Sequence, residues 1–221
     1  MKKLLALVLL VSTALAVYTQ DGNLKKQTYL RIGYSLPTWK YFGLTDKSDW
    51  GDDFKRIGGV FEVGNIFMLN GIKLSPGMRL GINIDYLSVN YHRFSNEAVT
   101  FKENIVFVGS KIGPSFSYSP VDRLVFDAFF KFNPVWVAAD IASQGDEKDF
   151  FMGFLGIKYG VGLNVRYSVL MLGFEINPGF VKMKLYDEEE NSFTDEYRSN
   201  ATDNGKKTNA PGINFTVGLS F

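Results

Sequence analysis

The stretch Pro211–Phe221 reads Pro-Gly-Ile-Asn-Phe-Thr-Val-Gly-Leu-Ser-Phe, and it decides the fold. Side chains along a β-strand point alternately to its two faces, so every second residue shares a face. One face of this stretch carries only small or polar residues, and the other is apolar throughout. The apolar residues are Ile213, Phe215, Val217, Leu219 and Phe221. The stretch therefore predicts a strand that separates a polar from an apolar environment.

The same two-faced alternation recurs along most of the chain. It predicts eight strands, at residues 28–36, 55–68, 78–93, 104–118, 124–138, 150–167, 170–186 and 211–221. The connections after the second, fourth and sixth strands are short, and the others are long. In an up-and-down meander alternate connections lie at the same end, so all the long loops share one rim. We therefore predict an all-β fold, an eight-stranded antiparallel up-and-down β-barrel.

Local signals refine this prediction. Asn70-Gly71 and Pro76-Gly77 are both turn signals between the second and third strands. The alternation of the third strand slips at Leu87, which predicts a β-bulge. The polar segments 95–103, 139–149 and 187–209 are predicted to be loops, and the seventh strand loses its regularity towards its end.

The N-terminal residues 1–16 are typical of a signal peptide. Two lysines precede the apolar run 4–15, and Ala14-Leu15-Ala16 forms a small-residue cleavage site. The apolar run is too short for a membrane-spanning helix, which needs about 20 residues. We expect residues 17–27 to form a periplasmic lead-in and residues 28–221 to form the barrel.

Composition narrows the function classes. The chain has no cysteine, which excludes a lipid-anchored lipoprotein, a disulfide scaffold and a thiolate metal site. Without the two signal-peptide lysines, 24 − 2 = 22 basic residues face 23 acidic ones, so nothing favours nucleic acid as a partner. The remaining 221 − 16 = 205 residues suit one domain.

Three features indicate that the apolar face points outwards into lipid. The polar face is rich in glycine, which leaves room for long charged neighbours in a narrow lumen. The apolar face is too bulky to fill that lumen. Tyrosines and tryptophans gather near strand ends, as at membrane interfaces; they are Tyr34, Tyr86, Tyr118, Trp136, Tyr159 and Tyr167. The alternative is a soluble, lipocalin-like barrel with the apolar face inside.

The inward face then carries the candidate site. Its charged residues are Arg31, Glu62, Arg79, Asp85, Lys111, Asp127, Lys131, Lys158, Arg166 and Glu175. Buried charges must be paired, so interleaved cations and anions predict a plugged lumen held by a network of ion pairs. The alternative is a narrow, gated, weakly anion-preferring pore.

Catalytic and metal sites find little support. The single histidine, His92, precedes Ser95 and Glu97, which is similar to an outer-membrane lipid A deacylase. That family, however, places its serine two residues after the histidine on the same strand face. Aspartates could offer Ca²⁺ their carboxylates in the first loop, but without EF-hand spacing; they are Asp46, Asp49, Asp52 and Asp53. We predict no enzyme, no cofactor and no metal site, with a lipid hydrolase as the remaining alternative.

The chain resembles the small bacterial outer-membrane β-barrels, the group around the OmpA membrane domain, OmpX and PorT-like proteins. The resemblance rests on the signal peptide, the eight-strand meander, the stretch Lys111–Pro120 and the final Phe221. It implies that the barrel-assembly machinery reads Phe215, Val217, Leu219 and Phe221 as a C-terminal signal. We expect a monomer whose role is structural or in surface interactions, with outer-membrane lipid or lipopolysaccharide and surface proteins as partners.

Overall fold

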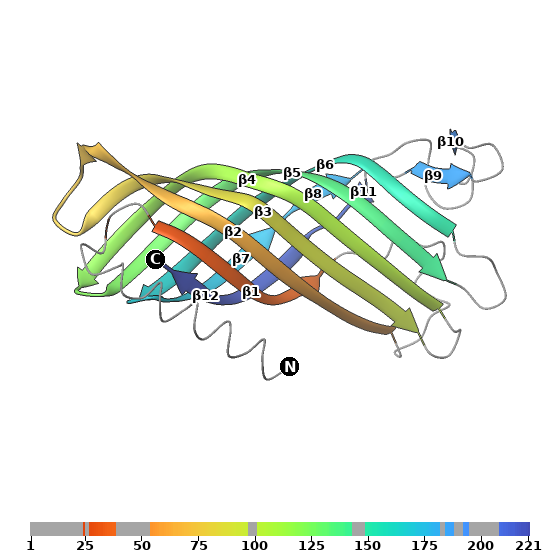
Figure 1. Cartoon of the computed structure of the whole chain (residues 1–221), viewed down its shortest axis with the longest axis horizontal. Helices are drawn as coiled ribbons and strands as arrows, with labels where there is room; N and C mark the ends of the chain where they lie inside the picture. The colour runs from red at the N-terminus through yellow and green to blue at the C-terminus, as the bar shows by residue number, and fades with distance from the viewer. Residues whose placement is uncertain are drawn as a thin grey trace.

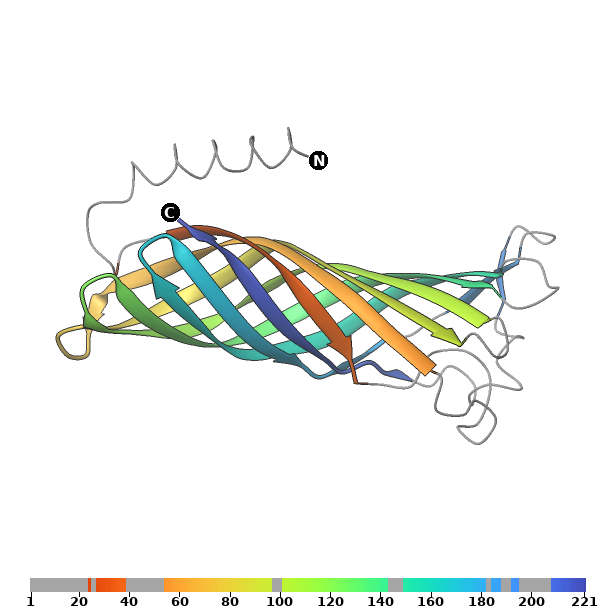
Figure 2. The same ribbon diagram turned by 90° about the horizontal axis from the view of Figure 1, so that it is seen from below.

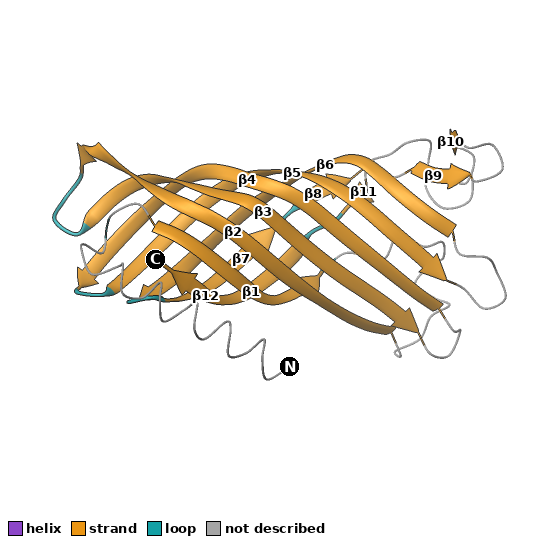
Figure 3. Ribbon diagram, in the orientation of Figure 1, coloured by secondary structure: helices purple, strands orange, loops and turns teal. Residues whose placement is uncertain are grey.

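The computed structural model describes Leu24 and residues 27–38, 54–96, 101–142, 149–181, 184–187, 192–194 and 208–221. Within these ranges the chain is built from strands, which Figure 3 draws in orange, and no helix is present. The strands are β1 (Gln27–Pro37), β2 (Phe54–Lys73), β3 (Met78–Asn96), β4 (Phe101–Val121), β5 (Leu124–Ala142), β6 (Asp149–Tyr167), β7 (Leu170–Asn177), β8 (Gly179–Val181), β9 (Lys184–Asp187), β10 (Ser192–Thr194), β11 (Thr208–Asn209) and β12 (Gly212–Ser220).

The strands close into one antiparallel barrel (Figure 1). Each of β1 to β6 pairs with the next along the chain, β12 pairs with both β1 and β7, and β7 pairs back to β6. β7, β8 and β9 follow one another along β6 as one interrupted strand. Counting β7–β9 as the seventh strand and β11–β12 as the eighth gives the predicted eight-stranded meander.

The barrel is closed by the C-terminal strand β12, which pairs with β1. In the ladder between β1 and β12, Tyr34 lies opposite Phe215 and Leu30 opposite Leu219. The backbones of Thr28 and Phe221 exchange two hydrogen bonds of 2.8 Å each beyond the last pair of this ladder. Closure removes the open sheet edge that would otherwise leave backbone groups unpaired.

The apolar face of the barrel points outwards, as predicted. Phe130 is 48% exposed and Leu163 56% exposed, whereas Lys158 is 4% exposed and Glu175 2% exposed. The lipocalin-like alternative is therefore wrong. The two views of Figures 1 and 2 show a long, slanted cylinder whose strands β2 to β6 extend well beyond β1 and β12 at one end. We call this the outer end, and the end with the short turns the inner end.

The predicted bulge and one of the predicted turns have opposite outcomes. The predicted bulge is confirmed, because the β3 register shifts between Asp85 and Ser88 and leaves two consecutive exposed residues there. The turn at Asn70-Gly71 is wrong, because β2 continues to Lys73. The chain turns instead after Leu74, where Gly77 has φ 78° and an added Cβ would lie 2.6 Å from the Ser119 carbonyl oxygen.

The strands are longer at the outer end than the sequence predicts. β3 runs to Asn96 and β4 begins at Phe101, so most of the predicted loop 95–103 is strand. β5 likewise continues to Ala142, and β10 and β11 lie within the predicted loop 187–209. The predicted loss of regularity in the seventh strand is confirmed, because this strand is divided into β7, β8 and β9. The predicted signal peptide and the acidic first loop lie outside the described residues.

Most buried side chains at the outer end are apolar, a feature that strand alternation does not predict. The buried residues there include Phe94, Ile105, Phe107, Val135, Val137, Ala139 and Val181, each at most 2% exposed. In this part of β4 and β5 both strand faces carry apolar residues, so alternation gave no signal. Buried ion pairs of the described residues therefore lie in the inner part of the lumen, and the outer part is largely apolar, with Glu103 buried there as an exception.

Candidate functional site

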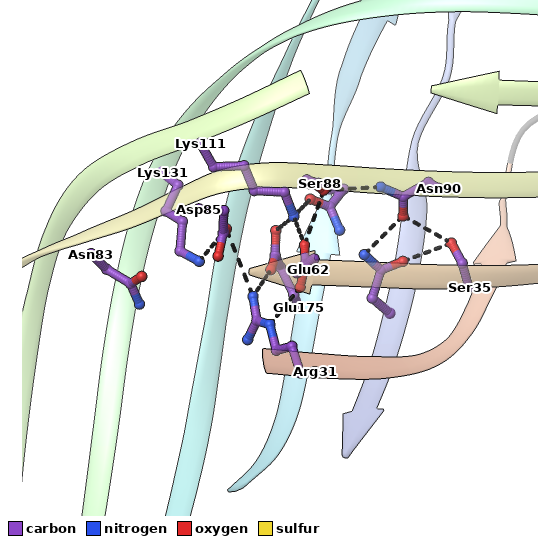
Figure 4. Close-up of polar contacts among 12 residues, drawn as sticks. Arg31, Ser35, Glu62, Asn83, Asp85, Ser88, Asn90, Lys111, Lys131 and Glu175 are labelled. Atoms are coloured by element: carbon purple, nitrogen blue, oxygen red, sulfur yellow. Dashed lines mark hydrogen bonds and ion pairs between the residues drawn. The ribbon is translucent and has the colours of Figure 1, made fainter. Parts of the chain in front are cut away.

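Six buried charged side chains meet inside the inner part of the lumen, and we call them the central charge cluster (Figure 4). Each is at most 2% exposed. They come from β1, β2, β3, β4, β5 and β7, so the cluster reaches across the bore. Its three cations balance its three anions; the members are Arg31, Lys111, Lys131, Glu62, Asp85 and Glu175.

Two carboxylates of this cluster each contact two cations. Glu62 Oε2 lies 2.5 Å from Arg31 Nε, and its Oε1 lies 2.6 Å from Lys111 Nζ. Glu175 Oε1 lies 2.5 Å from Lys111 Nζ, and its Oε2 lies 3.1 Å from Arg31 Nη2. The four side chains form a ring of alternating charge. Such mutual contacts offset the desolvation that burial imposes on each ion.

Asp85 joins the third cation to this ring. Its Oδ2 lies 2.7 Å from Lys131 Nζ and 3.8 Å from Arg31 Nη2, and its Oδ1 accepts a hydrogen bond from the Tyr29 hydroxyl. The Lys131 ammonium lies 4.3 Å from the centroid of the Phe129 ring, a cation–π distance. The inner lumen therefore holds its charges by aromatic faces as well as by ion pairs.

Glycines on the inward face make room for these long side chains, as predicted. A Cβ added at Gly160 would lie 2.4 Å from Glu175 Oε1. A Cβ added at Gly64 would lie 2.6 Å from the Tyr29 hydroxyl oxygen. Any larger residue at either position would displace a member or a neighbour of the central charge cluster.

A separate ion pair lies nearer the inner end. Arg166 Nε lies 2.6 Å from Asp127 Oδ2, and its Nη2 donates to Asp127 Oδ1 at 2.9 Å. This is the bidentate geometry that suits a guanidinium and a carboxylate. The Ser117 hydroxyl donates to the same carboxylate at 2.5 Å, and Arg166 also contacts Gln27.

Two predicted lumen residues stand outside both groups. Lys158 is buried, and its Nζ lies 4.5 Å from the centroid of the Phe107 ring; among the described residues no carboxylate lies within salt-bridge distance of it. Arg79 is only half-buried near the inner rim, where its Nη1 donates to the Met78 carbonyl oxygen at 2.8 Å.

A layer of uncharged polar side chains lies beside the central charge cluster. Ser35 Oγ lies 2.7 Å from His92 Nε2 and 2.7 Å from Asn214 Oδ1. Asn214 Nδ2 donates to Asn90 Oδ1 at 3.1 Å, and Asn90 Nδ2 donates to Ser88 Oγ at 3.3 Å. Figure 4 shows that Ser88 links this layer to the cluster. The layer belongs to the same polar interior.

The histidine arrangement differs from the one the sequence suggested. His92 points into the lumen and is 1% exposed, whereas Ser95 lies three residues later on the opposite strand face. Glu97 lies outside the described residues. The hydroxyl neighbour of His92 is Ser35, 57 residues away on β1. Spacing within one strand could not find this pair, because it depends on how β1, β2 and β3 align.

Sequence reasoning also missed Glu103, which it placed in a loop. Glu103 lies in β4 and is fully buried. The aspartates considered for Ca²⁺ lie outside the described residues. Among the residues that the structure describes, no group of three or more histidine, cysteine, aspartate or glutamate side chains is placed to hold a metal ion. In the same residues, no helix is long and apolar enough to span a membrane.

The predicted C-terminal signal lies on the closing strand. Phe215 is 48% exposed and Val217 50% exposed on the outside of the barrel, and Leu219 and Phe221 are half-buried. Phe215, Val217 and Leu219 share the outward face of β12, as the alternation predicts, and Phe221 follows the last residue of that strand.

Comparison with known proteins supports the fold and goes no further. No family model matches the sequence, and no curated protein matches it. A major outer membrane protein from Thermus thermophilus is similar in structure, with a TM-score of 0.50 and 13% identity over 89% of this chain and 99% of that chain. Ail, the attachment invasion locus protein of Yersinia pestis, has a TM-score of 0.43 and 13% identity over 89% of this chain and 99% of that chain. The outer membrane protease OmpT of Escherichia coli has a TM-score of 0.44 and 12% identity over 92% of this chain and 97% of that chain. The chain thus has the barrel fold of bacterial outer-membrane proteins.

Proposed function

We propose that this protein is an integral outer-membrane β-barrel with a plugged polar lumen, and that its role is structural or in surface interactions. The fold supports the location, because a closed barrel satisfies its backbone hydrogen bonds internally and can therefore cross a bilayer. The outside of the barrel supports it too, since large apolar side chains are exposed on every long strand. In water such a surface would be strongly unfavourable.

The central charge cluster is the main support for a plugged lumen. Its members extend from six strands into a bore that is narrow in any eight-stranded barrel. Ions that pass along the axis would have to part the ring formed by Arg31, Glu62, Lys111 and Glu175. Removing one partner from such a buried group typically costs about 3–5 kcal/mol. The ring therefore favours a closed lumen.

Planar-bilayer recording tests this proposal. We expect the wild-type protein to insert without discrete conductance steps. Insertion is verified independently by the heat-dependent shift of a folded barrel on a detergent gel. Frequent, reproducible steps from the wild-type protein would overturn the plug and favour the alternative, a narrow gated channel.

One observation favours that alternative. Among the described residues, the amide nitrogens Asn83 Nδ2, Asn164 Nδ2 and Asn177 Nδ2 are buried without a hydrogen-bond partner. Ordered water commonly satisfies such groups. A file of water past the cluster would give the lumen a conducting path, and the same recording distinguishes the two functions.

The outer end supports the role in surface interactions. β4 has 21 residues, which at about 3.3 Å per residue and a tilt near 45° rise roughly 50 Å. The apolar band of such barrels is only about 25 Å tall. Much of the sheet would then project from the membrane as a platform for lipopolysaccharide or a surface protein. Fractionation with the outer membrane, together with labelling of intact cells, tests this placement.

We propose no enzymatic role. His92 and Ser95 face opposite sides of β3, so they do not form the pair required of a lipid hydrolase. Ser35 is close to His92, but its hydroxyl also contacts Asn214, and both Ser35 and His92 are 1% exposed. Deacylation of lipid A by the wild-type protein that is lost in His92→Ala would overturn this proposal.

We further propose that the barrel folds as a monomer and that the assembly machinery recognises the exposed apolar face of β12. Truncation of Phe221 tests this, with impaired insertion in cells and normal refolding in detergent as the expected result. Equal loss in both settings would indicate a purely structural role for Phe221.

A further inference from the structure

The outward faces of β2, β3 and β4 change character at the same level. On β3, outward residues are apolar from Leu80 to Tyr91, and the next outward residue is Arg93. On β4, the outward residues from Tyr118 back to Val106 are apolar with few exceptions. The next outward residues towards the outer end are Asn104 and Lys102. β2 shows the same change, because the exposed residue next to Ile57 on this face, towards the outer end, is Lys55.

Strand geometry places this change at the edge of the bilayer. Leu80 and Tyr91 are 91 − 80 = 11 residues apart. At about 3.3 Å per residue and a tilt near 45°, this corresponds to about 26 Å along the barrel axis. The apolar band of outer-membrane barrels is about 25 Å tall. Arg93 therefore lies at the height of the lipid headgroups on the outer side.

The ladder brings the three cations together. Lys55 and Lys102 both lie opposite Ser95, on either side of β3, so their backbones are about 10 Å apart. Arg93 precedes Ser95 by two residues on the same strand face. All three side chains are exposed. Long, flexible side chains at these spacings can converge on one phosphate group.

Asn104 completes the set of donors, and Tyr91 orients it. The Tyr91 hydroxyl donates to Asn104 Oδ1 at 2.7 Å, which leaves the Asn104 amide nitrogen as a donor beside Arg93. Tyr91 is 39% exposed directly below, where an aromatic ring suits the interface.

We propose that Lys55, Arg93, Lys102 and Asn104 form a binding site for the phosphate groups of lipids in the outer leaflet. The inference rests on the proposed location in the outer membrane. Arginine and lysine are the usual ligands of phosphate oxygens, and arginine can bind two oxygens at once. The apolar surface of β3 and β4 continues below the site, so the acyl chains of the same lipid would lie against it.

Lipid retention in nanodiscs tests the site. The barrel is refolded into phosphatidylcholine nanodiscs that contain a small fraction of either diphosphoryl or dephosphorylated lipid A with the same acyl chains. Native mass spectrometry then measures which lipid stays bound to the released protein. We expect retention of the diphosphoryl form, with about a fivefold loss in Arg93→Gln and a larger loss when Lys55→Gln and Lys102→Gln are added.

The controls separate a site from net charge. Arg93→Lys keeps the charge and should restore most retention, whereas Arg123→Gln removes an exposed charge at the inner turn and should leave retention unchanged. An equal loss in Arg123→Gln, or equal retention of both lipids, would overturn the proposal. Millimolar inorganic phosphate should not displace the lipid; displacement would indicate a site for free phosphate. A normal heat-dependent gel shift and outer-membrane fractionation of the Gln variants keep the proposed function independent of this result.

Discussion

The inner and outer parts of the barrel use the same strands with opposite polarity. Along β4, Lys111 and Ser117 point inwards in the inner part while Ile112 points outwards. In the outer part, Phe107 points inwards and Lys102 outwards. In the proposed setting lipid surrounds the level of Ile112 and water the level of Lys102, so the outward face becomes polar between them, while the inward face is already apolar at Phe107. One continuous strand can thus serve as a membrane wall and as a small water-exposed domain.

The largest expected loss of stability comes from a substitution in the central charge cluster. Glu62→Ala removes a carboxylate that contacts Arg31 and Lys111, and it leaves both cations short of a buried partner. We expect the free energy of unfolding to fall by about 3–5 kcal/mol. Urea unfolding in detergent micelles, followed by tryptophan fluorescence, measures it. Arg79→Gln at the half-buried rim is the matched control, and a comparable loss there would contradict the importance of the cluster.

Phe107→Ala should destabilise the outer part while the inner part stays folded. The substitution leaves a cavity in the apolar interior and removes the ring that faces Lys158. A loss of about 3 kcal/mol is expected for a buried phenylalanine. Hydrogen exchange should increase in residues 101–109 and stay unchanged in residues 111–118. A uniform increase over both ranges would show that the two parts are one cooperative unit.

An arginine on the outward face should destabilise the barrel more in the inner part than near the level where β4 becomes polar. Leu163→Arg places a cation on the outward face of the inner part and should cost roughly 2–4 kcal/mol in a bilayer. Val106→Arg, near the level where β4 becomes polar, should cost about 0–1 kcal/mol. Unfolding in lipid vesicles compares them. Equal costs at the two positions would place the apolar band at another height.

The smallest effect concerns the uncharged polar layer. Ser35→Ala removes one hydroxyl that lies between His92 and Asn214. The expected loss is about 1 kcal/mol, typical of a single hydrogen bond. The same urea titration measures it, and Ser95→Ala on the outward face is the control. A loss above about 3 kcal/mol would give this layer a larger structural role.

The sequence predicted the fold because each strand of the inner part has one polar and one apolar face. Alternation at Leu163 and Asn164 separates the two faces, the bulk of the apolar face indicates that it points outwards, and the slip at Leu87 located the bulge. The prediction failed where local signals conflict with strand pairing. Asn70-Gly71 is a good turn sequence, yet β2 passes through it.

The site was predicted as a set of residues but not as contacts. The inward positions followed from alternation, whereas the partners depend on register and closure. Arg31 and Glu175, for example, are 144 residues apart and meet only because β12 closes the barrel between β1 and β7. The apolar outer interior was missed because Val135 and Val137 lie inwards while Trp136 lies outwards, so both faces read as apolar.

The orientation of the two faces can be measured directly, because the chain has no cysteine and single spin labels can be placed without background. Labels at Phe130→Cys, Arg93→Cys and Phe107→Cys in lipid vesicles would report collisions with oxygen, which enriches in lipid, and with a nickel chelate, which stays in water. We expect high oxygen and low nickel accessibility at residue 130, high nickel accessibility at residue 93, and low accessibility to both at residue 107. High nickel accessibility at residue 130 would contradict a lipid-facing apolar surface.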